Sequence, residues 1–398
     1  MIERKISKIL GITLITLLTS GCTDTEKEVL AENKIEANKS VVISAVGDVM
    51  VHTSQLNAQK NDDGSYDFSN NFKYIENLIK DSDLSIANLE TTININKNPS
   101  GYPSFNSPTE LLSALKDTGF DIISTINNHS LDTGYSGVIS TLEEIDKVGL
   151  KSIGTKKNES EKNYIIENIN DINIGIASFS YGDIKPNNKY LNGIPSGKAT
   201  NLVNVISSTD INDAFSTIKN ELDLMKDEGV DFIILNLHWG NEYEQHPSDY
   251  QRNLAQMLAN EDVDIILGSH PHVVQPIEFI SSELNQSHET LVIYSMGNII
   301  SNQREEEMGF KESENGIIPI IKIEKDSNNV ARITDASYVP TWVNKYNKDG
   351  KNQYEIIPIY EDLEIASTKY NAPKEDLEIS FNNTTSLITD KRTELYKY

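Results

Sequence analysis

Six short apolar runs constrain the fold of this chain more than any other feature of its sequence. Each run is four to six residues long, carries β-branched side chains or leucine and is bounded by turn residues, which is typical of buried strands. The runs lie at 41–46, 84–87, 121–126, 232–237, 263–267 and 291–294. Because helical segments separate several of them, the pattern predicts an α/β fold.

Three intervening segments carry helix signals, at 107–119, 211–229 and 248–258. In the first, Ser107 and Glu110 predict a capping box with Pro108 at the first helical position, and Gly119 would end the helix. Apolar residues recur at helical spacing in the second segment. Ser248 begins a further capping box, which predicts the start of the third helix.

The order of elements changes towards the carboxyl end of the chain. A hairpin is expected at 164–178, and later strands at 316–323, 331–339 and 354–359 have no helix between them. The fold is therefore α/β first and mostly β afterwards, an α+β arrangement overall. The stretch 363–398 is polar, and the sequence leaves open whether it is a small appended segment or a loose tail.

The size and charge of the chain exclude several classes of protein. With 398 residues, 37% of them hydrophobic, it can fill the core of one large domain or two ordinary ones. Its 60 acidic and 35 basic residues give a net charge of −25, so we expect no nucleic acid partner. The single cysteine, Cys22, excludes an internal disulfide framework and a thiolate metal cluster.

The first 40 residues predict an export signal followed by a tether. Basic residues precede an apolar run at 9–18, which is too short to span a bilayer. Residues 18–21 then lead into Cys22 and resemble a bacterial lipoprotein signal, in which cleavage frees the cysteine thiol for lipid attachment. We expect a signal peptide at 1–21, lipidation of Cys22 and a flexible tether at 22–40. The alternatives are an ordinary signal peptide cut nearby and an uncleaved anchor.

That prediction places the protein at the extracytoplasmic face of the bacterial cell membrane, anchored there by lipid. The membrane would then be one of its partners.

Polar residues of a restricted kind follow the predicted strands. They are Asp48, Asn88, Glu90, Asn127, Asn128, His129, His238, His270, His272 and Asn298. Because segments that leave the carboxyl ends of strands in an α/β sheet meet along one edge, we expect these side chains to converge. Imidazole, carboxylate and amide groups together favour Zn, Mn or Fe, with Ca or Mg less suited.

Each of these residues also has a purely structural interpretation. His238 follows a continuous apolar run and could be a core histidine bonded to the backbone, and Asn127 and Asn128 could cap the next turn. His270 and His272 flank Pro271 and could be a chance pair of loop histidines. In an extended segment this spacing of two would instead point both rings to one side, as chelation requires.

Six strings, in order across 41–302, resemble the poly-gamma-glutamate capsule synthesis protein CapA family. They are Ala-Val-Gly-Asp-Val-Met-Val-His (45–52), Ala-Asn-Leu-Glu-Thr-Thr (87–92), Ile-Asn-Asn-His-Ser-Leu-Asp (126–132), Leu-His-Trp-Gly-Asn-Glu-Tyr (237–243), Gly-Ser-His-Pro-His-Val-Val-Gln-Pro (268–276) and Tyr-Ser-Met-Gly-Asn (294–298). The resemblance implies a four-layer αββα sandwich of the metallophosphatase-like type, related to calcineurin-like phosphoesterases, with additional C-terminal strands. The domain would cover 41–362, with its motifs in 41–302 and a β-rich part at 303–362.

The resemblance also implies roles for single residues. Asn128 would be an amide ligand, and His129, beside Asp132, the catalytic acid or transition-state donor. His238 and His270 would bind one metal ion, and Asp48 and His272 a second. Glu90 is a further candidate ligand. Residues expected to line the site are Asn88, Asn127, Trp239, Glu242 and Asn298.

Two departures from the phosphoesterase pattern leave the number of ions, one or two, open. The pattern expects a histidine where this chain has Met50, whose thioether is a poor ligand for these metals. It also expects a bridging aspartate after the second strand, where the chain offers Asn88 and Glu90.

These observations predict a membrane-anchored protein with a working or vestigial hydrolase site. It would act in synthesis, assembly or export of an anionic cell-surface polymer such as poly-gamma-glutamate, with that polymer and its synthase subunits as partners. The alternatives are a non-catalytic subunit of the same machinery and a stand-alone surface metallophosphoesterase. The acidic surface opposes any binding of a polyanion away from the metal or a local basic patch.

Overall fold

The computed structural model of the chain describes residues 39–397. The predicted signal peptide, Cys22 and the tether up to residue 38 lie outside this range. Within it, no helix is both long enough and apolar enough to cross a bilayer.

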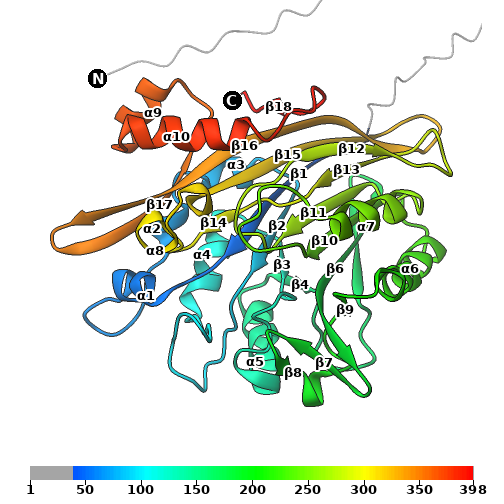
Figure 1. Ribbon diagram of the computed structural model, residues 1–398, viewed down its shortest axis with the longest axis horizontal. Helices are drawn as coiled ribbons and strands as arrows, with labels where there is room; N and C mark the ends of the chain where they lie inside the picture. Colours follow the sequence, from blue (N-terminus) through cyan, green and yellow to red (C-terminus); the bar gives the residue numbers. More distant parts are fainter. Residues whose placement is uncertain (1–38, 398) are drawn as a thin grey trace, which may run out of the picture. The chain divides into compact units, whose positions relative to one another are not determined.

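The first of two nine-stranded sheets combines the start and the end of the domain (Figure 1). Its parallel half contains β1 (Lys39–Val49), β2 (Leu84–Leu89), β3 (Ile122–Ser124) and β4 (Lys151–Ile153). Its antiparallel half contains β15 (Asn315–Lys325), β16 (Ala331–Lys348) and β17 (Lys351–Pro358), with β15 beside β1. Two short strands, β14 (Asn298–Ile300) and β18 (Glu394–Leu395), pair in parallel with β1 and β16.

The second sheet comes from the middle of the chain. Its order is β12 (Ile277–Ser281), β13 (Glu289–Ile293), β11 (Ile265–Ser269), β10 (Phe232–His238), β6 (Ile172–Lys185), β7 (Asn188–Leu191) and β8 (Ile194–Pro195). Two more strands, β5 (Tyr164–Ile169) and β9 (Val205–Ser207), pair with β6. Strands β6, β10, β11 and β13 are parallel neighbours. All six predicted apolar runs therefore form strands, and the hairpin at 164–178 is formed by β5 and β6.

Alternation along each strand divides its apolar side chains between two cores. In β1, Ile43 packs between the two sheets, whereas Val46 packs on the outer face. That outer face is covered by α1 (Thr53–Gln59), α2 (Ser69–Phe72), α3 (Glu76–Lys80) and α4 (Glu110–Thr118). The outer face of the second sheet is covered by α6 (Ile211–Asp227) and α7 (Asp249–Ala259). The result is the predicted four-layer α/β/β/α sandwich, and α5 (Gly134–Lys147) packs in a smaller cluster near β7.

The helix signals were correct for α6 and α7 but misplaced the start of α4. The capping box at Ser248 forms as predicted. The predicted box at Ser107 does not form, because the Ser107 hydroxyl lies 3.0 Å from the Thr91 hydroxyl and α4 begins at Glu110. Gly119 ends α4 with φ of 111°, the left-handed conformation that glycine adopts readily.

The polar stretch at the carboxyl end is a packed segment throughout its described part. Helices α9 (Leu363–Tyr370) and α10 (Lys374–Thr385) lie along β16 in Figure 1. Tyr370 and Leu377 pack against Trp342 of β16 and Ile357 of β17. These apolar contacts fix the segment although its overall composition is polar.

A buried ion pair joins the segment after β14 to the long strand β16. Arg304 precedes α8 (Glu305–Met308), and Glu314 ends the short 3₁₀ helix η2 (Glu312–Glu314). Glu314 Oε2 accepts hydrogen bonds from Arg304 Nη2 at 2.6 Å and from Trp342 Nε1 at 3.0 Å, and Glu314 Oε1 accepts from the backbone N–H of Glu305 at 3.0 Å. The protein thus supplies partners for both oxygens of this buried carboxylate.

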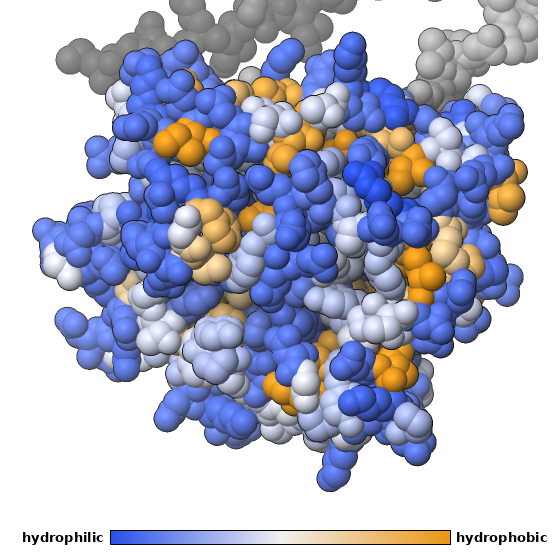
Figure 2. Space-filling view, in the orientation of Figure 1, coloured by the Kyte–Doolittle hydropathy of each residue, from blue (hydrophilic) through white to orange (hydrophobic). Residues whose placement is uncertain are grey.

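The face shown in Figure 2 is mainly hydrophilic, with small, separate apolar patches. Scattered exposed apolar residues are normal on soluble domains and imply no binding surface by themselves.

Candidate metal centre

A tight approach of two backbone segments positions Asp48. The register of β1 against β2 shifts between Val46 and Asp48, and such irregularities redirect the following side chain. A Cβ atom on Gly47 would lie 2.0 Å from the carbonyl oxygen of Gly297, so glycine alone fits at that position. The same approach places Asn298, at the start of β14, directly opposite Asp48.

The remaining polar residues lie at the carboxyl ends of four strands, as predicted. Asn88 is the penultimate residue of β2 and Glu90 follows that strand, Asn128 and His129 follow β3, His238 ends β10, and His270 and His272 follow β11. All of these side chains are buried. Both sheets thus contribute candidate metal ligands to one shared cluster.

Hydrogen bonds to Asp48 link the two sheets at this cluster. Asn88 Nδ2 donates to Asp48 Oδ1 at 2.7 Å, and His272 Nδ1 lies 3.0 Å from Asp48 Oδ2. Burial alone would raise the pKa of Asp48, but the hydrogen bond and the charge of His272 outweigh it and hold this pKa below its usual value. Asp48 is therefore negatively charged and could act as a metal ligand. Asn298 Oδ1, 3.1 Å from His272 Nδ1, helps to orient that ring.

A second set of contacts surrounds His238. Its Nε2 lies 3.0 Å from Asn128 Oδ1 and 3.1 Å from His270 Nδ1. Burial lowers the pKa of His238 to about 3 and that of His270 well below its usual value, so both rings are neutral. Neutral imidazole is the form that binds metal ions. The other ring nitrogen of His270, Nε2, is hydrogen-bonded to the hydroxyl of Tyr181 on β6.

The backbone around His270 and His272 differs from the predicted extended segment. Both residues have positive φ, 101° and 59°, which is uncommon for non-glycine residues. The two rings nevertheless lie together, with centroids 5.9 Å apart. Strained backbone that persists at a buried polar cluster is typical of functional sites.

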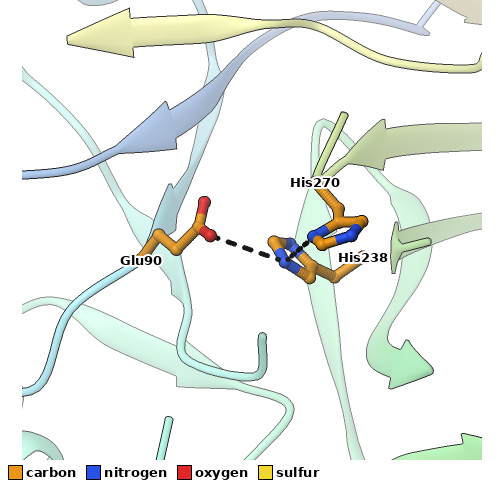
Figure 3. Close-up of side chains that lie close together, drawn as sticks. All are labelled: Glu90, His238 and His270. Carbon is orange, nitrogen blue, oxygen red and sulfur yellow. Dashed lines mark hydrogen bonds and ion pairs between the residues drawn. The ribbon is translucent and has the colours of Figure 1, made fainter. Parts of the chain in front are cut away.

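Glu90 is the least satisfied group in the cluster. Neither carboxylate oxygen has a hydrogen-bond partner, although the side chain is fully buried. Glu90 Oε1 lies 3.7 Å from His238 Nε2 and 3.7 Å from His272 Nε2. Figure 3 shows it facing His238 and His270 from the opposite side of the site. Burial, and then the charge of Asp48, raise the pKa of Glu90 well above its usual value.

The residues present fit a divalent cation. Ligand atoms of Glu90, His238 and His270 lie within 4.8 Å of one another, as do those of Asp48, Glu90 and His272, and those of Glu242, His270 and His272. A cation would supply the partner that Glu90 lacks, and buried carboxylates are normally paired or bound to metal. Nitrogen and oxygen donors without thiolate suit Zn, Mn or Fe.

An open cleft of about 720 Å³ leads to the cluster. His129 and His272 line it. His129 Nδ1 lies 2.8 Å from Asp132 Oδ2, which also accepts a hydrogen bond from the backbone N–H of Phe105 at 2.6 Å. Because Nδ1 is occupied by Asp132, the other ring nitrogen of His129 remains available to a bound molecule.

The model for the family described as "Bacterial capsule synthesis protein PGA_cap" matches residues 42–303. The chain belongs to this family. The match confirms the family that the six strings predicted. It also covers all the residues of the candidate metal centre.

Two curated relatives of this PGA_cap family member bear related names. The chain is 28% identical over 279 residues to the PGA biosynthesis protein CapA of Bacillus subtilis, covering 68% of this chain and 66% of that protein. It is 23% identical over 304 residues to the capsule biosynthesis protein CapA of Bacillus anthracis, covering 73% of this chain and 67% of that protein. The chain thus spans about two thirds of the length of these relatives.

Among solved structures, the NAD nucleotidase of Haemophilus influenzae matches with a TM-score of 0.46 and 13% sequence identity. The match covers 91% of this chain and 65% of that one.

Two residues expected to line the site have other positions or roles in this PGA_cap protein. The Trp239 ring is fully buried in the core between the second sheet and its helices, and its Nε1 donates to the Tyr294 carbonyl at 3.0 Å. It therefore does not line the site. Asn127 holds the loop, because its Nδ2 donates to the Leu89 carbonyl at 2.8 Å and its Oδ1 accepts from the backbone N–H of His129. Glu242 is exposed and lines the cleft as expected.

Sequence reasoning missed several residues of the PGA_cap site. Tyr181 contacts His270, and the cleft is also lined by His52, Tyr243 and Gln303. His52 and Tyr243 could have been identified as site residues, because they end the family-like strings 45–52 and 237–243. Nothing in the local sequence marks Tyr181, because it reaches the site only through the pairing of β6 with β10.

Proposed function

We propose that this PGA_cap family member is a membrane-anchored protein of the capsule machinery with a metal-dependent hydrolase site. It would act in the synthesis, assembly or export of an anionic cell-surface polymer such as poly-gamma-glutamate, together with the synthase subunits of that polymer. Family membership supports a role in capsule synthesis, and the name of the Bacillus subtilis relative, a PGA biosynthesis protein, supports poly-gamma-glutamate as the polymer. The cleft over the metal centre supports hydrolysis.

The observation that carries the proposal is the position of Glu90 between two pairs of donors. His238 and His270 lie on one side and Asp48 and His272 on the other, and Glu90 belongs to a donor group with each pair. A buried carboxylate without hydrogen-bond partners destabilises a fold. Its presence at this position therefore favours a functional role. Glu90 could therefore serve as a cation ligand together with either pair.

The chain's own residues suit hydrolysis of a phosphoryl or carbonyl compound. A bound divalent cation would supply an activated water and stabilise developing negative charge. His129, oriented by Asp132, would protonate the leaving group. Asn88 and Asn298 hold Asp48 and His272 in place through the contacts described above.

Metal content and turnover of the purified protein test this proposal together. We expect one or two Mn, Fe or Zn ions per chain, and hydrolysis of bis-p-nitrophenyl phosphate that chelation abolishes. His270→Ala and Asp48→Ala should lose metal and at least about a hundredfold in rate. His129→Ala should keep the metal but lose about 10² to 10⁴ in kcat. His288→Ala, outside the site, is the matched control.

Bound metal with no turnover would contradict hydrolysis and favour a non-catalytic subunit. Turnover in a protein whose loss leaves the amount of surface polymer unchanged would favour a stand-alone surface phosphoesterase.

Anchoring through Cys22 is a separate part of the proposal. We expect Cys22→Ser to release the processed chain from the membrane fraction or to leave it as unprocessed precursor, because the lipid attachment site is lost. Ser20→Ala, in the same signal, should have neither effect. Firm membrane retention of a processed Cys22→Ser chain would contradict lipid anchoring.

A further inference from the structure

Among the residues that the structure describes, the lining of the cleft over the candidate metal centre contains no lysine or arginine. The lining residues are Met50, His52, Tyr102, Pro103, His129, Asp132, Asn192, Ile194, Glu242, Tyr243, His272, Gln303, Glu307 and Met308. Three of these are carboxylates and none is lysine or arginine. The electrostatic character of the cleft is therefore negative wherever a metal ion does not offset it.

The three carboxylates lie at different positions in the cleft. Asp132 is buried beside His129, and its Oδ1 has no hydrogen-bond partner. Glu242 has a carboxylate oxygen within 4.8 Å of ring nitrogens of His270 and His272. Glu307 is exposed on α8, where its Oε1 accepts from Asn302 Nδ2 at 2.8 Å. Of the three, Glu307 is the one that does not contact the metal centre or its histidines.

Aromatic rings line the same cleft. Tyr102 lines the cleft and is 72% exposed. Tyr243 packs its ring 5.9 Å from that of His272. Aromatic faces combined with carboxylates form the surroundings that proteins use to bind ammonium groups.

We infer that the cleft selects substrates with a single anionic group, which would bind at the metal centre. The remainder of such a substrate is neutral or carries an amine cation. Glu307 is then a specificity-determining residue. The inference rests on the proposed function and names its substrate class. It excludes the interior of a polycarboxylate chain, in which every repeat would bring another negative charge past Glu307.

Three p-nitrophenyl phosphodiesters of matched shape test this selection. Their second alcohols are choline, 3,3-dimethylbutanol and 3-hydroxypropionate, so that the same chromogenic leaving group is joined to a cationic, a neutral or an anionic remainder. For the Mn²⁺-loaded protein we expect kcat/KM to be highest for the choline diester and lowest for the 3-hydroxypropionate diester. Raising the salt concentration should narrow this difference, because exposed charges are screened.

Substitution of Glu307 should change the preference without abolishing hydrolysis. We expect Glu307→Gln to reduce the ratio of kcat/KM for the choline diester to that for the 3-hydroxypropionate diester by about two- to fivefold, the effect of one exposed charge. Glu307→Lys should reduce it further. Glu306→Gln, on the same helix but outside the lining of this cleft, should leave the ratio within about twofold of the wild type.

Binding of methylphosphonate monoesters of the same three alcohols, measured by calorimetry on the Mn²⁺-loaded protein, provides a readout without turnover. Turnover or binding that favours the anionic compound, or a ratio that Glu307→Lys leaves unchanged, would overturn the inference. An absence of binding by all three compounds would also overturn it. Binding in the expected order without turnover of any diester would support the inference and contradict the proposed hydrolysis.

Discussion

Two buried clusters of charged groups in this protein differ in how completely the protein satisfies them. Glu314 has partners for both oxygens, from Arg304, Trp342 and the backbone of Glu305. Neither oxygen of Glu90, which is also buried, has a hydrogen-bond partner, and Oε1 lies 3.7 Å from ring nitrogens of His238 and His272. A carboxylate that serves only stability is surrounded by donors, whereas one that binds an external group is left without them. The number of hydrogen-bond partners thus distinguishes a structural carboxylate, Glu314, from a candidate ligand-binding carboxylate, Glu90.

Removal of one partner from the satisfied cluster should have the largest effect. Arg304→Met leaves Glu314 buried with an uncompensated charge, so we expect the free energy of unfolding to fall by about 3–5 kcal/mol. Urea denaturation of the variant and of Lys391→Met, an exposed control, would measure this. A loss below about 1 kcal/mol would mean that the ion pair contributes little to the fold.

Metal binding should stabilise the unsatisfied cluster almost as strongly. At free Mn²⁺ a hundredfold above its dissociation constant, we expect the free energy of unfolding to rise by about 2.7 kcal/mol over that in chelator. His270→Ala should remove most of this gain. Identical unfolding curves with and without Mn²⁺, and with Zn²⁺ in its place, would argue against a cation site.

The same substitution, glutamate to glutamine, should change the free energy of unfolding in opposite directions in the two clusters. In chelator, Glu90→Gln removes a negative charge that burial and the neighbouring Asp48 disfavour, so we expect a gain of about 1–3 kcal/mol in stability. Glu314→Gln should instead lose a comparable amount, because it weakens two hydrogen bonds from charged or ring donors. A loss of stability in both variants would show that Glu90 has a structural role after all.

Most of the fold could be predicted because its signals are local. The apolar runs formed strands, and the polar residues at their ends met, because parallel strands place their carboxyl ends together. Contacts between distant segments could not be predicted. Ser107 bonds to Thr91 instead of capping α4, Tyr181 reaches His270 from β6, and Trp239 turns into the core although its neighbour His238 faces the site. The lack of hydrogen-bond partners for Glu90 could not be predicted either, because its surroundings come from both sheets.

A half-buried, paired carboxylate should show the smallest effect and a clear pH dependence. Asp390 accepts hydrogen bonds from Arg392 and from the backbone N–H of Phe279, and the Arg392 side chain is the main cause that lowers its pKa to about 2. Because the pKa in the folded state is lower than in the unfolded state, the stabilisation is complete above about pH 4 and is lost as the pH falls towards 2.

We therefore expect Asp390→Asn to cost about 1 kcal/mol at pH 7. Urea denaturation should show a smaller difference from the wild type at pH 3. A difference that stays constant from pH 7 to pH 3 would assign the effect to shape and not to charge.

The metal centre draws its donors from both sheets at once, since Asp48 and Glu90 belong to the first and His238, His270 and His272 to the second. Neither donor group that contains Glu90 exists in a partly folded chain with only one sheet formed. Capture of an ion by either group would therefore be a late event in the folding of this domain, and its rate would report when the two halves of the sandwich come together.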